Sequence, residues 1–169
     1  MRNQTRLYSL SLRDGRTYAL TAIFMLGNIA LPQLCHLAPH GGQMFLPIFF
    51  FTLVGAYKYG FTVGLATAVL SPIANSMLFS MPSAQMLPPM LIQSVVLAAA
   101  SAALARHMGE KVTPAALGLT ATACLLAGLL IERAMISVDH GILSSLALAV
   151  PGLLLQTFGG YWLIRKLLN

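Results

Sequence analysis

The chain has 169 residues, of which 57% are hydrophobic and only 8% are charged. A soluble domain carries about 25% charged residues, so this composition cannot supply a polar shell that faces water. The formal net charge of +6 would suit a nucleic-acid partner, but the ten Lys and Arg residues are scattered near segment ends instead of gathering on one face. Composition therefore excludes an ordinary soluble domain and predicts that the lipid bilayer covers most of the surface. The scatter of the basic residues argues against nucleic-acid binding.

The chain begins with a basic, polar tail over residues 1–16, which we expect to be cytoplasmic. A single membrane domain over residues 17–169 follows, because no linker or charge block divides the rest of the chain. Its apolar segments lie at about residues 17–34, 44–57, 60–79, 86–105, 113–131 and 142–164. These runs are long and do not alternate between apolar and polar residues, so they predict an all-α integral membrane protein with six transmembrane helices. No small-residue cleavage site follows the first run, so we expect an uncleaved first helix.

Charge gives the orientation of these six helices. Nine of the ten basic residues fall on one side of the predicted topology, and only Arg133 falls on the other. Lys and Arg are enriched in cytoplasmic connections, so both termini are predicted to be cytoplasmic.

The connection between the first two segments holds His36, His40 and Gln43 among the helix breakers at residues 39, 41 and 42. The second segment, residues 44–57, has 14 residues and reaches only about 21 Å as a helix. This is less than the roughly 30 Å of a bilayer core, so either the helix begins near Gly42 or the connection enters the membrane beside a protein cavity. Pro47 is expected in the first turn of the second helix.

The connection between the third and fourth segments is a second polar feature. Ser71-Pro72 is expected to break the third helix about two turns before its end, because proline removes a backbone donor. Asn75 lies beyond the break, and a lone amide there needs a partner. The methionines of this region are adaptable enough to contact an irregular ligand, although ordinary apolar packing is the alternative.

Two further sets of polar residues have two readings each. Glu132 and Arg133 end the fifth segment near Asp139 and His140, where they would either join a site or form an exposed salt bridge of little energetic value. Gln93 and Gln156 lie deeper, where they would either form the floor of a cavity or hydrogen-bond between helices.

Polar groups at membrane depth are costly unless they are paired or face a cavity, so this asymmetric gathering predicts a substrate site at the outer end of the bundle. The candidate substrate-binding residues are His36, His40, Gln43, Met44, Asn75, Met81, Gln85, Met86, Gln93, Glu132 and His140. Hydrolase, zinc-protease and phosphate-loop motifs are absent from the sequence, so we expect neither an enzyme nor an ATPase. We also expect no metal site and no resident cofactor, although the histidines leave open a metal-containing ligand such as heme or cobalamin.

Small residues recur at helical spacing in several segments. Gly60, Gly64 and Ala68 form such a row in the third segment, and pairs of alanine and serine do so in the fourth. The rows favour close packing of helices within the bundle. The alternative is that one row docks another membrane protein, and in the first segment the candidates for this are Thr17, Thr21 and Ala22.

The order of these features resembles the substrate-binding S component of energy-coupling factor (ECF) vitamin transporters. The resemblance rests on Met44-Phe45-Leu46-Pro47, Gly55-Ala56-Tyr57-Lys58-Tyr59-Gly60, Gly64, Ser71-Pro72 and Met81-Pro82, and it covers a little over half of the chain. It implies a six-helix subunit of a bacterial or archaeal cytoplasmic (inner) membrane. The implied partners are a transmembrane coupling subunit and two ATPases. The implied ligand is a vitamin-like small molecule. It would be captured at the outer face by the connection between the first two helices and by the connection between the third and fourth helices.

The chain departs from this family in one motif, and some of its residues favour one kind of ligand. The family's coupling contact is an Ala-x-x-x-Ala motif in the first helix, where this chain has Thr17 and Thr21, with Ala19 and Ala22 at a different spacing. Among vitamins, the histidines and methionines favour cobalamin or another tetrapyrrole slightly. The alternative function is a ligand-free membrane scaffold subunit resembling the rod-shape protein MreD. Such a scaffold would not need polar residues gathered beside helix breakers.

Overall fold

The computed structural model describes residues 7–37, 39–136 and 141–168, and these ranges contain helices and no strand. The helices are α1 (Gly15–Cys35), α2 (Gly41–Phe45), α3 (Pro47–Tyr59), α4 (Phe61–Phe79), α5 (Leu87–Met108), α6 (Pro114–Met135), α7 (Ile142–Leu148), α8 (Val150–Leu154) and α9 (Gly160–Leu168). A π-helical turn, η1 (Leu155–Gly159), joins α8 to α9.

Four helices, α1, α4, α5 and α6, are long and apolar enough to cross a membrane. Within the described ranges, α7 together with residues 150–168 forms a fifth candidate span, bent by 55° at the break between its two parts. The predicted class, an all-helical multi-pass membrane protein, is therefore confirmed with four or five apolar spans. With 13 residues, α3 is shorter than these spans.

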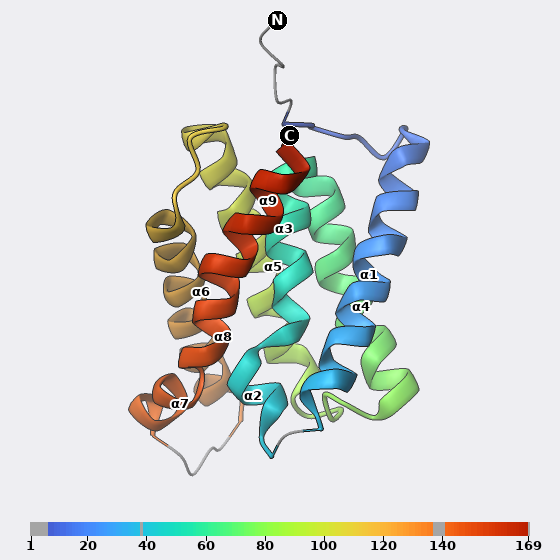
Figure 1. Ribbon diagram of the computed structural model, residues 1–169. Coiled ribbons are helices and arrows are strands. Elements are labelled where there is room, and N and C mark those ends of the chain that lie inside the picture. The colour runs from blue at the N-terminus through green and yellow to red at the C-terminus, as the bar shows by residue number, and fades with distance from the viewer. Residues whose placement is uncertain (1–6, 38, 137–140, 169) are drawn as a thin grey trace, which may run out of the picture.

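The helices form an upright bundle around α3 (Figure 1). The described ends of the chain lie at one end of this bundle, here called the terminal end, while α2 and α7 lie at the opposite, distal end. α3 packs against α1, α4, α5 and α9, and 11 of its 13 residues are buried. A helix shorter than the bilayer core is acceptable there because protein, and not lipid, surrounds its ends.

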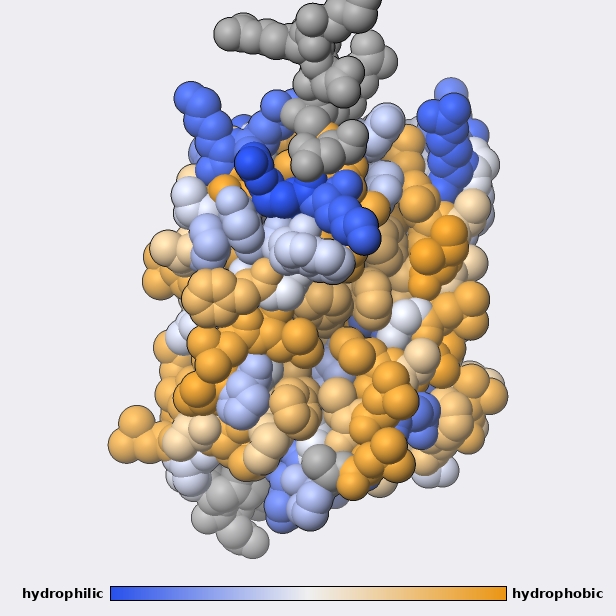
Figure 2. All heavy atoms as spheres, viewed as in Figure 1, coloured by the Kyte–Doolittle hydropathy of each residue, from blue (hydrophilic) through white to orange (hydrophobic). Residues whose placement is uncertain are grey.

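The face of the bundle that Figure 2 shows is mostly apolar over its middle. In the most apolar stretch of each of the four long helices, only 22% to 39% of the residues are buried. The exposed residues include Tyr18, Ile23 and Leu26 on α1 and Leu119 and Leu130 on α6. Such a surface is unfavourable in water and suits the hydrocarbon of a bilayer.

Small residues allow the central helices to approach closely. A Cβ atom at Gly64 of α4 would overlap Ala56 of α3, and Ala68 and Ala98 join Ala56 in a buried cluster. The prediction that these small residues serve helix packing is confirmed for this part of the row.

The expected break in the third segment is wrong, because Pro72 lies inside α4 and the helix continues to Phe79. A proline removes one helical hydrogen bond, but helices in a membrane bundle tolerate this where neighbouring polar groups satisfy the freed backbone. A helix break does occur in the second segment. It lies at Leu46, the residue between α2 and α3, which has a φ of 48°. Pro47 occupies the first turn of α3, as predicted.

The N-terminal segment from Leu7 onward packs against the terminal end of the bundle. The backbone N–H of Tyr8 donates to the carbonyl of Lys58 at 3.0 Å, and that of Leu10 donates to Tyr59 at 3.2 Å. The rings of Tyr8 and Tyr59 stack with their centroids 5.8 Å apart. The described part of the tail is thus fixed to the helix ends, and α1 begins at Gly15, inside the predicted tail.

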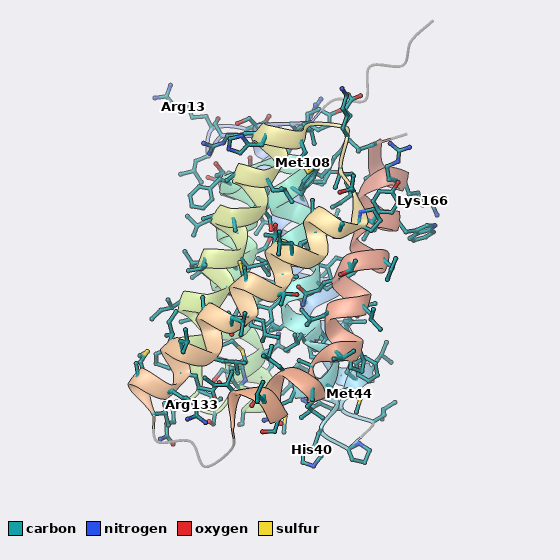
Figure 3. The ribbon with its side chains drawn as sticks, turned by 90° about the vertical axis from the view of Figure 1, so that its left-hand side faces the viewer. Arg13, His40, Met44, Met108, Arg133 and Lys166 are labelled. Carbon is teal, nitrogen blue, oxygen red and sulfur yellow. The ribbon has the colours of Figure 1, made fainter. Side chains whose placement is uncertain are left out.

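The charges divide between the two ends. All Lys and Arg residues in the described ranges lie at the terminal end except Arg133. Figure 3 shows Arg13 and Lys166 at that end and Arg133 at the distal end, where His40 also lies.

Candidate functional site

The connection between α1 and α2 forms part of the distal end. His36 caps the C-terminal end of α1, and His40 precedes α2 with a left-handed backbone at φ 56°. The two histidines therefore do not align along one helix. The helix breakers at residues 39, 41 and 42 had already argued against a helix there. Both are exposed, and the ring of His36 lies over Gly42, where an added Cβ would come within 2.7 Å of Nε2.

Glycine at position 152 lets α8 close against α2. A Cβ at Gly152 would lie 2.6 Å from the carbonyl carbon and oxygen of Phe45 and 2.8 Å from the carbonyl oxygen of Met44. These are backbone atoms, so a side chain there would force the two helices apart. The end of the first connection and the first half of the last span thus close the distal end together.

The other predicted residues of the distal end are less enclosed. Met81 and Gln85 are exposed, while Met86 precedes α5 and is half-buried. Gln43 is exposed, and Met44 and Glu132 are half-buried. No hydrogen bond joins residues 36–46 to residues 80–86 within the described chain. His140 lies outside the described residues.

Asn75 belongs to a buried polar network between α1, α3 and α4. Its Nδ2 donates to the carbonyl of Asn28 at 3.0 Å and to that of Ser71 at 2.9 Å. Nδ2 of Asn28 donates in turn to the hydroxyl oxygens of Thr52 and Ser71, each at 3.2 Å. Its Oδ1 accepts from the backbone N–H of Phe51 at 3.2 Å. The network joins the three helices. Within it, Oδ1 of Asn75 has no hydrogen-bond partner among the described residues.

A small cavity lies inside the bundle between α3, α5, α6 and η1. Its lining consists of Leu46, Phe49, Gln93, Leu97, Ala121, Cys124, Leu125 and Gln156. The space that water centres can occupy is about 10 Å³, which is roughly the room needed by one water molecule. Of the predicted site residues, Gln93 lies here and not at the distal surface.

Gln156 is the most unusual residue of this cavity. Its side chain is only 3% exposed, and it lines the cavity together with Gln93. Amides buried in proteins are normally paired, because an unpaired polar group loses the hydrogen bonds that water would give it. Gln156 therefore places an amide, with its donor and its acceptor, at a cavity that has room for about one water molecule.

Local backbone features bring the two glutamines to the cavity. The π-helical turn η1 carries Gln156, and such turns are frequent at functional sites. Gly118 of α6 makes room for this turn, since a Cβ there would lie 2.7 Å from Oγ1 of Thr157. Gly128, also on α6, lies directly against the amide of Gln93, which a larger residue would displace.

The cavity has a neutral lining. None of its lining residues is an acid, a lysine, an arginine or a histidine. Among the residues that the structure describes, no group of three or more His, Cys, Asp or Glu side chains could hold a metal ion. The arrangement suits neutral hydrogen bonding between two amides and apolar walls.

Sequence reasoning missed Asn28, although a single asparagine within an apolar segment was a usable signal. It did list Thr17, Thr21 and Ala22 as docking residues. In the structure Thr17 and Thr21 face the interior, with exposed fractions of 1% and 6%, whereas Ala22 faces outward. Only Ala22 of the three is available to a partner in this conformation.

Comparison with known proteins gives no relative: the chain matches no family model, and neither a curated protein nor a solved structure shows significant similarity to it.

Proposed function

We propose that the chain is a membrane-embedded substrate-binding subunit for the uptake of a vitamin or related micronutrient. In this proposal the substrate is captured at the outer face and delivered inward with an ECF-type coupling subunit and two ATPases. The six spans are α1, α2 with α3, α4, α5, α6, and α7 through α9. Both termini are then cytoplasmic in a bacterial or archaeal cytoplasmic membrane. The basic residues at the terminal end support this orientation.

The amide of Gln156, buried beside a cavity, is the observation that carries the proposal. A lipid-embedded bundle that needed no ligand would gain stability by placing an apolar side chain there, because an unpaired buried amide is unfavourable. Gln156 faces a cavity that Gln93 also lines, on helices that come from different parts of the chain. A bound substrate would supply hydrogen-bond partners to these amides.

Substrate binding requires the distal end to open. Pockets for small molecules enclose roughly 300–1,000 Å³, far more than the space available to water in this cavity. The bend of 55° in the last span separates α7 from the helices that follow. A movement of α7 and α8 away from α2 would therefore enlarge the cavity toward the exposed histidines and methionines, which keep cobalamin or another tetrapyrrole among the candidates.

The second candidate is a ligand-free scaffold subunit resembling MreD, and the small volume of the cavity favours it. Such a subunit would hold one water between the glutamines and bind no vitamin. The two candidates differ in a property that purified protein can report.

Thermal unfolding in detergent, measured with a panel of water-soluble vitamins, tests the proposal. A ligand that binds only the folded state raises the unfolding temperature through mass action. We expect one compound to raise it by several degrees in the wild type and not in Gln156→Met. Gln33→Met is the control, because Gln33 lies on α1 outside the cavity. Equal unfolding temperatures with every compound would favour the scaffold.

A further inference from the structure

We infer that the outward face of residues 150–168, the second part of the last span, binds an anionic phospholipid of the bilayer leaflet at the terminal end. Arg165 and Lys166 would bind the phosphate of its headgroup. One acyl chain would lie along Leu154, Phe158 and Trp162. This surface is on the outside of the bundle, so lipid binding there does not depend on what the interior cavity binds.

This part of the last span has one buried and one exposed face. Its buried residues recur at every fourth position, and they are Gly152, Gln156, Gly160, Ile164 and Leu168. The buried face lies against α3, since a Cβ at Gly160 would come 3.4 Å from a methyl group of Leu53. Its exposed residues recur at the same interval, and they are Val150, Leu154, Phe158, Trp162 and Lys166, with Arg165 beside the last. Residues four apart share one side of a helix, so the exposed set forms a single stripe that faces away from α3.

The apolar part of this stripe suits an acyl chain. Leu154, Phe158 and Trp162 are 52%, 59% and 61% exposed, and large apolar side chains on a membrane span contact hydrocarbon. Trp162 is the one tryptophan of the chain, and tryptophan is enriched where the hydrocarbon meets the headgroups. Its ring therefore marks the level at which a phospholipid changes from acyl chain to phosphate.

The basic part of the stripe begins at this same level. Nζ of Lys166 lies 5.0 Å from the centroid of the Trp162 ring, so a cation–π contact holds the ammonium beside the indole. Arg165 is the next residue and is also exposed. Its guanidinium can bind two phosphate oxygens at once, while the lysine supplies a compact positive charge. Figure 3 shows Lys166 at the outer edge of the terminal end.

Charge favours an anionic headgroup over other occupants of this face. The described part of the last span, residues 141–168, contains no Asp or Glu, so a phosphate would meet two cations and no carboxylate of the same span. Anionic lipids attract Lys and Arg at the membrane surface, whereas a zwitterionic headgroup carries its own countercharge. A second copy of the chain is a poor occupant, because a two-fold symmetric contact through this face would bring the same cations together.

The single tryptophan makes this site directly measurable, because bromine atoms on an acyl chain quench indole fluorescence on contact. Purified protein is reconstituted in phosphatidylcholine vesicles that contain either brominated phosphatidylglycerol or brominated phosphatidylcholine. Quenching at equal mole fractions gives the relative affinity of the surface around Trp162 for the two lipids. The same titrations are run on Arg165→Gln/Lys166→Gln and on the matched control Arg13→Gln/Arg16→Gln, which removes two positive charges at the start of α1 instead.

We expect phosphatidylglycerol to bind the wild type at least about threefold more tightly than phosphatidylcholine, through two exposed charge contacts. High salt should reduce this preference in the wild type, because salt screens exposed charges. The preference should be lost in Arg165→Gln/Lys166→Gln and kept in the control. The unfolding temperature of Arg165→Gln/Lys166→Gln in detergent should equal that of the wild type, because both side chains are exposed.

Three results would overturn the inference. Equal quenching of the wild type by the two brominated lipids would show a lipid contact that does not recognise the headgroup. Equal loss of the preference in both double variants would assign it to the overall charge of the terminal end. Quenching of Trp162 by neither lipid would show that a second copy or another protein covers this face. The salt titration uses the wild type, so it remains decisive even if a variant fails to fold.

Discussion

The side-chain amide of Asn75 on α4 donates to the main-chain carbonyl of Asn28 on α1 at 3.0 Å. Asn28 in turn bonds through its side chain to Thr52, Ser71 and the backbone of Phe51. The two asparagines thus connect three helices in the buried part of the bundle. Their first role is structural, which distinguishes them from the glutamines of the cavity.

Replacement of Asn28 by alanine should destabilise the protein more than any single change at the distal surface. It removes three hydrogen bonds and leaves two hydroxyls with fewer partners, at an expected loss of about 1–3 kcal/mol. Thermal unfolding in detergent measures the effect, with Ser83→Ala at an exposed position as the control. An unfolding temperature equal to that of the control would contradict the structural role.

Asn75→Ala distinguishes a packing role from a ligand-binding role at the same position. The variant loses two hydrogen bonds, and in membrane proteins such bonds average about 0.6 kcal/mol each. We expect a lower unfolding temperature together with nearly unchanged ligand affinity. Lost affinity at full stability would instead restore Asn75 to the substrate site, as the sequence suggested.

Gly152→Ala should open the distal end. The added methyl group would meet the Phe45 carbonyl at 2.6 Å, which pushes α8 away from α2. Cys124 lines the cavity and is 6% exposed, so its thiol should react slowly with N-ethylmaleimide in the wild type and faster in the variant. The measurement uses a Cys35→Ser background.

The control for this labelling experiment is Gly141→Ala. Among the described residues, a Cβ at Gly141 would come near only the hydroxyl of Ser144, at 3.6 Å, so the substitution should leave the described fold undisturbed. Equal labelling rates of Cys124 in the two glycine variants would show that the contact between α2 and α8 does not close the cavity.

Ala22→Leu tests the exposed face of α1 as a docking surface. Because Ala22 faces outward, leucine there should leave the unfolding temperature unchanged while it reduces co-purification with the proposed coupling subunit and ATPases. Ala99→Leu on the exposed face of α5 is the matched control. Normal recovery of the complex with Ala22→Leu would remove this part of α1 from the docking surface.

The six-span topology can be tested with single cysteines in a background without Cys35 and Cys124. Ser83→Cys lies at the distal end and Glu110→Cys at the terminal end. A membrane-impermeant maleimide should label Ser83→Cys in intact cells and Glu110→Cys only after permeabilisation. The opposite pattern, or equal labelling of the two, would contradict cytoplasmic termini.

The class of protein and the outline of the bundle could be predicted from the sequence because lipid imposes strong demands on composition and helix length. The interruption of the helix around His40 and the place of Pro47 in a first helical turn could also be predicted, because glycine and proline act on the backbone locally. Pro72 was misread because a proline is tolerated inside a helix of a membrane bundle where the surrounding helices accommodate it. Local sequence does not contain that information.

The interior site was less predictable for the same reason. Gln93 and Gln156 were recognised as deep polar residues, but two readings remained open because hydrogen-bond partners depend on packing between distant segments. Asn75 was assigned to the ligand, whereas its amide nitrogen donates to the carbonyl of Ser71 and to that of Asn28, 47 positions away in the chain. The π-helical turn at Gln156 has no sequence signature that we could have used.

Native mass spectrometry of the protein, purified gently from its host and followed by identification of any released small molecule, tests the central claim most directly. We predict a co-purifying vitamin-like compound, bound to the wild type and absent from Gln156→Met. An empty wild-type protein that no vitamin stabilises against heat would contradict the account and favour a ligand-free scaffold.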